Sequence, residues 1–297
     1  MRITYYDEAG SDLQHFARSG VQPLEVNMSG SFGPAAKFVS TLAAAIDKAP
    51  CPTKALVLTN PHKLLGQCYP QEVLEACLRF CQQRDIHFIS DEVYALTEFS
   101  CAEVSDPAPF VSILSLNTRA LKCERSRIHT IWSTGVEFGA SGFRLGCIVS
   151  QDNPKLINRL ALSPNSEISS LSAILTTNIL SSPNLPFLIA LSSARLAEAY
   201  ICITTFFTER NIKYIPVGAG LNLFAQLAPK AKTWSEEDDM VEKLRGGGVL
   251  VSPGRHHYGR PPGKGWARIS FSVEPWRLQE ALKRMDLTLS SKNGVPQ

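Results

Sequence analysis

Residues 54–95 read "KALVLTNPHKLLGQCYPQEVLEACLRFCQQRDIHFISDEVYA", and this stretch decides the fold class. Residues 54–60 form a short apolar run that ends at a turn signal, which is typical of a buried strand. Residues 70–85 place apolar side chains at helical spacing behind a proline, as at the first turn of a helix. Residues 86–90 form a second short apolar run. A strand, a helix and a strand in this order predict parallel pairing in an α/β sheet.

The chain beyond this unit continues the pattern and then changes it. Further apolar runs lie at residues 110–116, 127–133 and 144–150. From about residue 154 the alternation of strands and helices gives way to several successive helices, followed by a mixture of strands and helices. The expected helices span 153–163, 168–182, 186–212, 235–248 and 274–289. The expected strands span 213–228 (two runs), 249–254 and 266–273. Ser235 is a plausible cap for its helix. We predict a large domain with a mainly parallel sheet over residues 1–180, and a smaller α+β domain with its connecting helix over residues 181–297.

Composition places the chain among ordinary globular proteins. It has 297 residues, of which 44% are hydrophobic and 19% charged, as is usual for folded domains. A net charge of +3 is too weak to indicate a nucleic-acid partner. We find no uninterrupted apolar run of membrane-spanning length and no secretory signal at the start. We therefore expect a cytoplasmic protein without membrane or nucleic-acid partners, with a disordered tail at residues 290–297.

The eight cysteines are scattered through apolar stretches, and no C-x-x-C pair occurs. That spacing gives no support to a zinc knuckle or a thioredoxin-type motif, so we expect no metal. Cys77 and Cys81 lie four residues apart in the expected helix and therefore share a face. Reduced thiols in the hydrophobic core are the interpretation that this placement favours.

Polar residues follow several of the expected strands. Asn60 ends the first run, Asp91 follows the second, and Ser133 ends a later one. In open α/β sheets, ligands bind outside the carboxyl ends of the strands. We therefore expect the functional site at this edge of the sheet.

Residues 131–150, "IWSTGVEFGASGFRLGCIVS", resemble a catalytic loop in their glycines, small residues and single arginine. Such a loop usually carries a reactive group at its mouth. Here Thr134, Gly135 and Val136 supply only one hydroxyl and two inert positions. The loop has the form of an active-site segment without an evident nucleophile or base.

Several motifs carry a family resemblance over nearly the whole chain. In order they are "TNPHKLLGQCYP", "ISDEVYA", "FGASGFRLGCIVS", "GAGLNLFAQLAP", "GGGVLVSPGRHHYG" and "GWARISFSV". Together they resemble the class I/II aminotransferase family of fold type I, and most closely its fungal 1-aminocyclopropane-1-carboxylate synthase-like branch. The resemblance implies pyridoxal 5′-phosphate bound between the two domains and a homodimer with shared sites.

The chain also departs from the family pattern. Val136 stands where the family has the lysine that binds the cofactor covalently, Gly135 stands at its preceding serine, and Glu137 matches the acidic residue after it. Lys63 and Leu64 occupy the positions of an asparagine and a proline. The start resembles the family's second major segment, so we expect the preceding phosphate-binding turn to be lost. We therefore expect no covalently bound cofactor, with pyridoxal phosphate only as a family remnant.

Other family positions are matched. The resemblance assigns the cofactor ring to Asp91 and Tyr94, the cofactor phosphate to Ser133 and Arg144, and the substrate carboxylate to Arg268. From the residues alone, a strand-end aspartate, a half-buried tyrosine and structural ion pairs of the arginines remain alternatives.

His256, His257 and Lys63 complete the candidate site. His256 and His257 match a family loop near the substrate, where exposed histidines or a general base are both possible. Lys63, Tyr94 and Asp91 are the candidate catalytic groups. If the pocket is retained, we expect Asp91, Tyr94, Arg144 and Arg268 to meet in one cleft, with a bound anion or Glu137 beside Arg144.

Three functional hypotheses follow. The first is a diverged enzyme that does not use lysine-bound pyridoxal phosphate and acts on a carboxylate-bearing small molecule by positioning and acid–base catalysis. Its reaction would be a cyclisation, elimination or rearrangement in a fungal biosynthetic pathway. The second is a non-catalytic pseudoenzyme or partner subunit. The third is a residual pyridoxal-phosphate lyase or transaminase.

Overall fold

The computed structural model describes residues 2–4, 20–26, 33–63, 65–162, 168–257 and 263–290. Its larger sheet has six strands in the spatial order β2-β1-β3-β4-β5-β6. They are β1 (Arg2–Thr4), β2 (Pro23–Glu25), β3 (Ala55–Thr59), β4 (His87–Asp91), β5 (Ile128–Ser133) and β6 (Gly146–Ser150). Neighbouring strands pair in parallel except β5 and β6, which are antiparallel. The predicted α/β class with a mainly parallel sheet is confirmed.

Two helices cover one face of this sheet, α2 (Ala35–Asp47) and α3 (Gln71–Gln83). The apolar spacing of α3 buries one side of the helix against the strands, and Cys77 and Cys81 both lie in that core. Burial raises the pKa of the Cys77 thiol to about 12 and that of Cys81 well above its usual range. Both are free thiols, as the spacing predicted.

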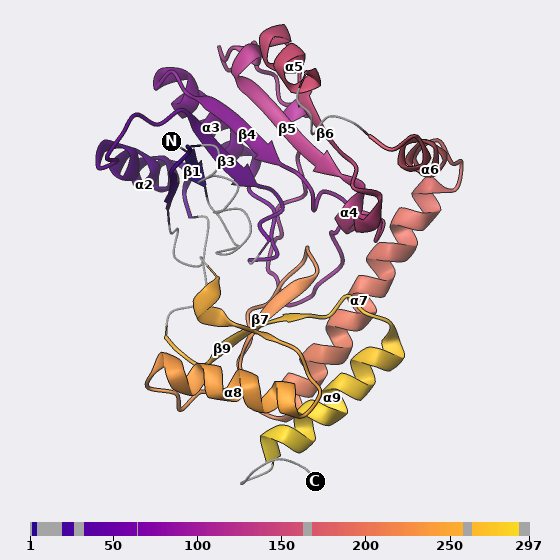
Figure 1. Cartoon of the computed structure of the whole chain (residues 1–297). Coiled ribbons are helices and arrows are strands. Elements are labelled where there is room, and N and C mark those ends of the chain that lie inside the picture. Colours follow the sequence, from indigo (N-terminus) through magenta and orange to yellow (C-terminus); the bar gives the residue numbers. More distant parts are fainter. Residues whose placement is uncertain are drawn as a thin grey trace.

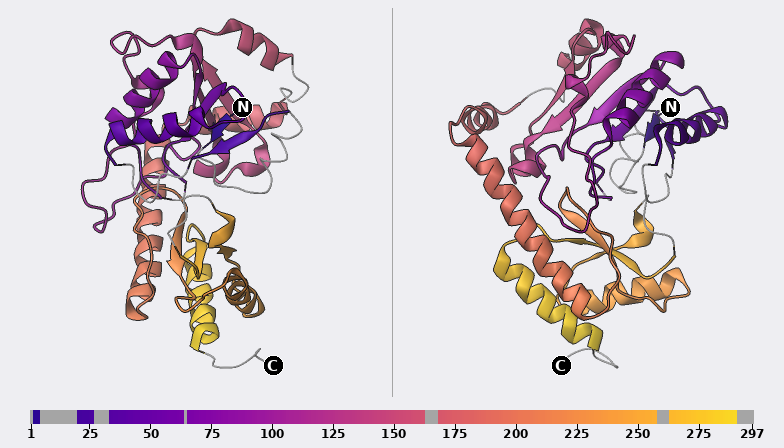
Figure 2. Two further views of the ribbon diagram at one scale, coloured as in Figure 1. Left: turned by 90° about the vertical axis from the view of Figure 1, so that its left-hand side faces the viewer. Right: turned by 180° about the vertical axis from the view of Figure 1, so that it is seen from behind.

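The smaller unit contains a three-stranded antiparallel sheet in the order β7-β9-β8. Its strands are β7 (Asn222–Gln226), β8 (Ser252–Pro253) and β9 (Trp266–Ser270). Helices α8 (Trp234–Gly246) and α9 (Pro275–Ser290) pack below it, and α7 (Leu185–Glu209) runs beside both units (Figures 1 and 2). The short helix α4 (Thr134–Glu137) lies between β5 and β6 of the large sheet, and α5 (Pro154–Ala161) and α6 (Ser170–Leu180) lie between β6 and α7. The small sheet therefore lies opposite the carboxyl edge of the large one.

Helix α7 meets the length and composition of a membrane-spanning helix. The sequence prediction concerned uninterrupted apolar runs, and Arg195 and Glu198 interrupt the apolar residues of α7, so the finding does not contradict it. In this fold the second half of α7 is a core helix, because Tyr200, Ile203 and Phe207 are buried among residues of the small domain.

Local structure differs from the sequence predictions at three places. Residues 110–116 form only a 3-10 turn, η1 (Ile113–Ser115), in which the Ser112 side chain accepts the N–H of Leu114. Helix α8 begins earlier than predicted, and its cap is Thr233 rather than Ser235. Thr233 and Glu236 form a reciprocal capping box there. Over 213–228 the structure has one strand, β7, and an isolated bridge from Tyr214 to Ala225. The tail at 291–297 lies outside the described residues.

Candidate functional site

The carboxyl ends of β3, β4 and β5 form one edge of the large sheet. The register pairs Thr59 with Asp91 and Asp91 with Ile131. The backbone N–H of Asn60 donates to the carbonyl of Asp91 over 2.9 Å, and Ser133 ends β5. The three strand-end residues singled out in the sequence therefore lie along the same edge, which faces the small domain (Figure 1).

Two fully buried polar side chains hold this edge in place. The Asn60 side chain accepts the N–H of Tyr69 over 3.1 Å and donates to the carbonyl of Val111 over 3.2 Å. Glu92 is buried directly after β4. Its carboxylate accepts from the hydroxyls of Ser90 (2.9 Å) and Ser112 (2.7 Å) and from the N–H of Ile113 (2.9 Å). Buried polar groups with this many partners fix a local geometry, because breaking any bond leaves a partner unsatisfied.

Asp91 and Tyr94 occupy the end of β4 and the turn that follows. Side chains alternate along a strand, and Phe88 lies in the core beneath α2 and α3. Asp91, three residues later, therefore belongs to the opposite face of the sheet. Tyr94 is buried, and its carbonyl accepts both the N–H (3.0 Å) and the hydroxyl (2.6 Å) of Thr97. The turn thus fixes the backbone on which these two candidate groups stand.

The single turn α4 carries the position of the missing lysine. Val136 is half-buried in it, and the buried hydroxyl of Thr134 has no hydrogen-bond partner among the residues that the structure describes. Glu137 accepts the N–H of Leu96 at Oε1 over 2.8 Å and the indole N–H of Trp132 at Oε2 over 2.6 Å. Burial raises the pKa of Glu137 to about 7, although both hydrogen bonds lower it.

Arg144 follows the short turn η3 (Ser141–Phe143). It has a left-handed backbone, with φ of 52°, and an exposed side chain. Its guanidinium donates to the carbonyl of Ser141 over 3.3 Å. Within the part of the chain that the structure describes, no carboxylate forms a salt bridge with it. Of the two alternatives expected for Arg144, pairing with Glu137 does not occur in the described structure, because the Glu137 carboxylate is bonded to Leu96 and Trp132 instead. A bound anion at Arg144 stays a prediction.

Lys63 lies half-buried in the loop after β3. Its carbonyl is near the small domain, since a Cβ added to Gly220 would lie 3.9 Å from it. The preceding residue, His62, is buried, and its Nδ1 accepts the N–H of Leu65 over 3.0 Å. Burial lowers the pKa of His62 to about 3, so this imidazole is neutral at physiological pH.

The small domain contributes Arg268 from the central strand β9. Ala267 and Ile269 belong to the core shared with α7, α8 and α9. By the alternation of a strand, Arg268 lies on the other face of the small sheet, which is turned toward the large domain (Figures 1 and 2). This is the side on which a carboxylate bound between the domains would lie.

The two histidines of the small domain have different environments. His256 is exposed, and its Nε2 accepts from the Nε of Arg255 over 3.2 Å. His257 is buried, hydrogen-bonded to the hydroxyl of Ser252 over 2.8 Å and packed edge-on against Phe224. The expectation of an exposed loop position is therefore wrong for His257, which packs within its own domain.

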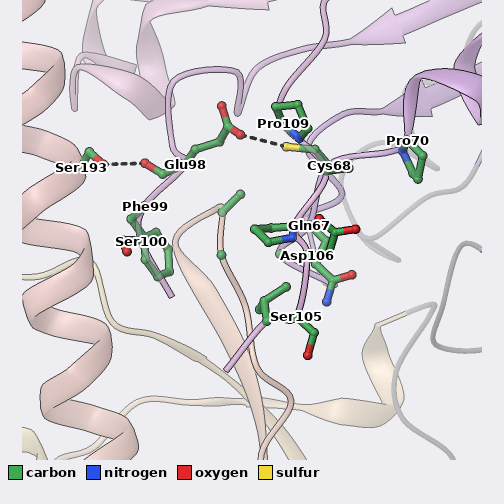
Figure 3. A pocket seen from close by; sticks show the side chains of 16 residues that line it. Gln67, Cys68, Pro70, Glu98, Phe99, Ser100, Ser105, Asp106, Pro109 and Ser193 are labelled. Carbon is green, nitrogen blue, oxygen red and sulfur yellow. Dashed lines mark hydrogen bonds between the residues drawn. The ribbon is translucent and has the colours of Figure 1, made fainter. Parts of the chain in front are cut away.

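A cavity of about 490 Å³ opens beside the loop after β3 (Figure 3). The thiol of Cys68 and the carboxylate of Glu98 point toward each other across its wall, with Sγ and Oε1 3.6 Å apart. The Ser193 hydroxyl donates to the carbonyl of Glu98 over 2.7 Å and ties α7 to this wall. The predicted catalytic and binding residues do not line this cavity. The convergence of Asp91, Tyr94, Arg144 and Arg268 on one cleft stays a prediction.

Comparison with known proteins settles the family. The model of "Aminotransferase class I and II" matches residues 16–285. The chain belongs to this family. The resemblance drawn from the motifs is thereby confirmed, including its 1-aminocyclopropane-1-carboxylate synthase-like homologues.

Curated relatives come from fungi and plants. A probable aminotransferase of Aspergillus oryzae is 43% identical over 284 residues, which cover 95% of this chain and 68% of the relative. The trimodular acetylaranotin synthesis protein of Aspergillus terreus is 41% identical over 81% of this chain and 28% of its own length. A 1-aminocyclopropane-1-carboxylate synthase of Arabidopsis thaliana is 27% identical over 95% of this chain and 56% of the relative. The chain thus spans only part of the length of these relatives.

Solved structures support the same fold. A mutant aspartate aminotransferase of Thermus thermophilus superposes with a TM-score of 0.75 at 20% identity. The match covers 97% of this chain and 69% of that one. At this identity the likeness shows the fold and not the activity.

The residues present do not fit a covalently bound pyridoxal phosphate. Val136 lies in the single turn α4 after β5, and its side chain has neither a lone pair nor an exchangeable proton. Arg144, the residue matched to the cofactor phosphate, points its guanidinium to its own turn. Asp91 and Ser133 remain at the sheet edge. The retained positions are therefore those that orient a ligand, and the lost position is the one that bonds to it.

Sequence reasoning missed two residues that shape this site. Glu92 anchors the turn that carries Tyr94, and His62 places a neutral imidazole beside Lys63. The signal for Glu92 was present, because a carboxylate directly after a strand has backbone N–H groups of the next segment within reach. His62 carries no comparable signal in the sequence.

Proposed function

We propose that the chain is a diverged aminotransferase-like enzyme that does not use lysine-bound pyridoxal phosphate. In this proposal it acts on a carboxylate-bearing small molecule by positioning and acid–base catalysis, in a cyclisation, elimination or rearrangement. The observation that carries it is Val136 in α4, at the end of a sheet edge that still presents Asp91 and Tyr94. The name of the Aspergillus terreus relative, a protein of acetylaranotin synthesis, supports a place in a fungal biosynthetic pathway.

Substrate binding is assigned to the small domain. Arg268 lies on the face of β9 that is turned toward the large domain. A guanidinium presents two parallel N–H donors to a carboxylate, which fixes both the position and the orientation of the acid. His256, exposed in the neighbouring turn, is available to a substrate at the mouth of the site, whereas buried His257 supports the turn from behind.

Proton transfer is assigned to the large domain. Asp91 supplies a carboxylate at the end of β4, Tyr94 a phenol in the turn behind it, and Lys63 an ammonium from the neighbouring loop. A carboxylate accepts a proton from a carbon or heteroatom acid, and a phenol or ammonium returns one to a leaving group. Because the substrate carboxylate is held by the opposite domain, these groups need only small displacements to act on its α or β atoms.

The decisive experiment tests covalent cofactor binding. The protein is incubated with pyridoxal phosphate, reduced with borohydride and examined by intact mass and peptide mapping. We expect no site-specific adduct, and only weak labelling when the variant Val136→Lys is treated in the same way, because Lys63 replaces the family's asparagine. A stoichiometric adduct on Lys63 of the unchanged protein would instead favour a residual pyridoxal-phosphate lyase or transaminase.

Exposed apolar side chains favour assembly with a second copy. Helix α6 buries only Thr176, while Leu171 and Ile174 on it, and Phe187 at the start of α7, are 72%, 57% and 65% exposed. Apolar surface of this kind usually marks a protein interface. A homodimer is the assembly that the family implies. A partner subunit without catalysis is the second candidate function, and the same surface supports it.

Sedimentation equilibrium distinguishes these assemblies. A homodimer predicts a mass near twice that of the chain, and the paired variant Leu171→Glu with Ile174→Glu should return it to a monomer. A monomer of the unchanged protein at high concentration would contradict the homodimer and direct attention to a different partner.

A further inference from the structure

A second cavity, of about 1020 Å³, lies on the α7 side of α4. It is bounded by the end of α4, the first half of α7, the end of α6, and the connection from β9 into α9. Its lining residues do not include those of the cavity beside the loop after β3. Its lining also lacks Asp91, Tyr94, Arg144 and Arg268, the residues assigned to the site proposed above.

The walls of this cavity are mostly apolar. Helix α7 contributes Leu188, Leu191 and Leu196, α9 contributes Leu278, and α6 contributes Ile179. Side chains from three helices thus surround a space large enough for a drug-sized molecule. The body of a ligand in such a space is expected to be hydrocarbon or aromatic, because burying apolar surface stabilises the complex.

Four charged side chains line the cavity, and three of them are carboxylates: Glu137, Glu198 and Glu274, with Arg195 as the cation. Glu274 is bonded to Arg277 over 3.3 Å. Arg195 and Glu198 lie three residues apart at exposed positions of α7, and no salt bridge joins them within the described residues. Glu137, in the wall at the end of α4, is the one carboxylate of the three that is not exposed.

Glu137 has only neutral hydrogen-bond partners in the described structure. These are the N–H of Leu96 and the indole N–H of Trp132. No salt bridge to a Lys, Arg or His side chain is formed within the described residues. The carboxylate of Glu92, directly after β4, repels that of Glu137 and raises its pKa further. An ionised carboxylate in this position is costly unless a cation joins it.

We propose that this cavity binds a small molecule with an apolar body and a protonated amine, and that the amine is bonded to Glu137. The apolar part lies against the leucines of α7 and α9. The ammonium supplies Glu137 with a positive charge that no side chain among the described residues bonds to it, and uses the remaining lone pairs of the Glu137 oxygens. An anionic ligand of the same shape is disfavoured, because three of the four charged side chains that line the cavity are carboxylates.

Three probes of similar shape and different charge test this inference by titration calorimetry: 2-phenylethylamine, 2-phenylethanol and 3-phenylpropionate. We expect the amine to bind most tightly. Its affinity should rise about tenfold between pH 6 and pH 8, because Glu137, with a pKa of about 7, ionises in that interval while the amine stays protonated. The alcohol and the carboxylate should show no such rise.

Matched variants separate the roles of charge and space. Glu137→Gln should weaken amine binding at pH 8 by about tenfold or more and abolish its pH dependence. Glu198→Gln, which removes a carboxylate at the exposed rim, should change it by less than about twofold. Ala199→Trp enlarges a side chain in the α7 wall of the cavity and leaves the Glu137 side chain itself unchanged. It should abolish binding of the amine even if Glu137→Gln does not fold.

Any of three results would overturn the inference. The first is that the carboxylate probe binds as tightly as the amine. The second is that Glu137→Gln leaves the affinity for the amine and its pH dependence unchanged, and the third is that none of the probes binds at about 10 mM. A pyridoxal-phosphate adduct on Lys63 would contradict the proposed function but not this inference, because the two tests concern different residues and different ligands.

Discussion

The two sides of the candidate site are built differently. On one side, the carboxyl edge of β3 and β4 is held by Asn60 and Glu92, both fully buried and bonded to backbone groups of neighbouring segments. On the other side, the loop from Ser133 to Arg144 has a buried hydroxyl at Thr134 with no hydrogen-bond partner among the described residues, and it ends in an exposed arginine. Within this loop Glu137 is bonded to Leu96 and Trp132, whereas the side chain of Arg144 reaches only its own turn. The edge is fixed by buried hydrogen bonds, and the end of the loop at Arg144 is not.

This difference shows which parts of a cofactor site depend on the cofactor. The bonds of Asn60 and Glu92 stabilise the fold whether or not a ligand is present, so the edge keeps its geometry. Half-buried Val136 and exposed Arg144 form few such bonds, so the chemistry at these positions can change at a smaller cost in stability. Replacement of a lysine by Val136 is such a change. Four predictions test this contrast, from the largest expected effect to the smallest.

Removal of the Glu92 side chain should have the largest effect. Glu92→Ala leaves two hydroxyls and one backbone N–H without their acceptor in a buried place. We expect a loss of about 2–4 kcal/mol in the free energy of unfolding, measured in urea. The control Glu280→Ala removes an exposed carboxylate paired with Arg284 and should cost less than about 0.5 kcal/mol. Equal losses in the two variants would mean that the edge is not specially anchored.

Arg268 should dominate carboxylate binding. If the small sheet presents this guanidinium to the site, Arg268→Ala should weaken binding of a dicarboxylate such as maleate by about 1.5–3 kcal/mol, the usual worth of a charged hydrogen bond. Arg277→Ala, on the exposed side of α9, serves as the control for loss of positive charge. A similar weakening in both variants would assign the effect to long-range charge instead.

The fold was predictable where the local pattern and the tertiary structure agree. The apolar run of β3, the helical spacing of α3 and the run of β4 each specify one element, and together they specify a parallel unit. Residues 110–116 look similarly apolar, yet Glu92 and Ser112 bind their backbone N–H groups and divert them into a turn. That outcome depends on a carboxylate about 20 residues away, which periodicity does not reveal.

The site was predictable to the extent that motifs fix backbone positions. Asp91 and Ser133 lie where strand ends placed them, and Arg268 lies on the central strand of the small sheet. Side-chain environments were harder to predict. His257 is buried because Phe224 and Ser252 come beside it only through the pairing of three strands. The partners of Glu137, from positions 96 and 132, likewise depend on tertiary packing.

Glu137 should make stability depend on pH. Its pKa is about 7 in the folded chain, above the ordinary value of 4.5. Between these values the folded state keeps a proton that the unfolded state loses, so this group lowers stability as pH rises from about 4.5 to 7. The free energy of unfolding of Glu137→Gln, relative to that of the unchanged protein, should therefore rise by about 1–2 kcal/mol between pH 5 and pH 7.5. This range allows for the partial solvent exposure of the carboxyl.

Urea unfolding of both proteins at the two pH values gives this difference directly. Any constant cost of placing an amide beside Trp132 cancels, since it is the same at both pH values. Buried His62 and His129 also titrate below their usual range, but they are present in both proteins and cancel as well. A difference that does not change with pH would mean that the Glu137 carboxyl titrates normally.

Arg144 should have the smallest effect on folding, and this sharpens the contrast with Glu92. Its side chain is exposed and donates only to the carbonyl of Ser141 within the described structure. Arg144→Ala keeps the same left-handed backbone strain, since both residues carry a Cβ, and should change stability by less than about 0.5 kcal/mol. Arg144→Gly, in contrast, relieves the strain at φ of 52° and should be as stable or up to about 1 kcal/mol more stable.

If the guanidinium binds an anion, both variants should lose binding of inorganic phosphate equally, although their stabilities differ. Unequal losses would assign the effect to the backbone. A loss of stability in Arg144→Ala comparable to that of Glu92→Ala would show that the loop is anchored as firmly as the edge, and the contrast between the two sides would fail.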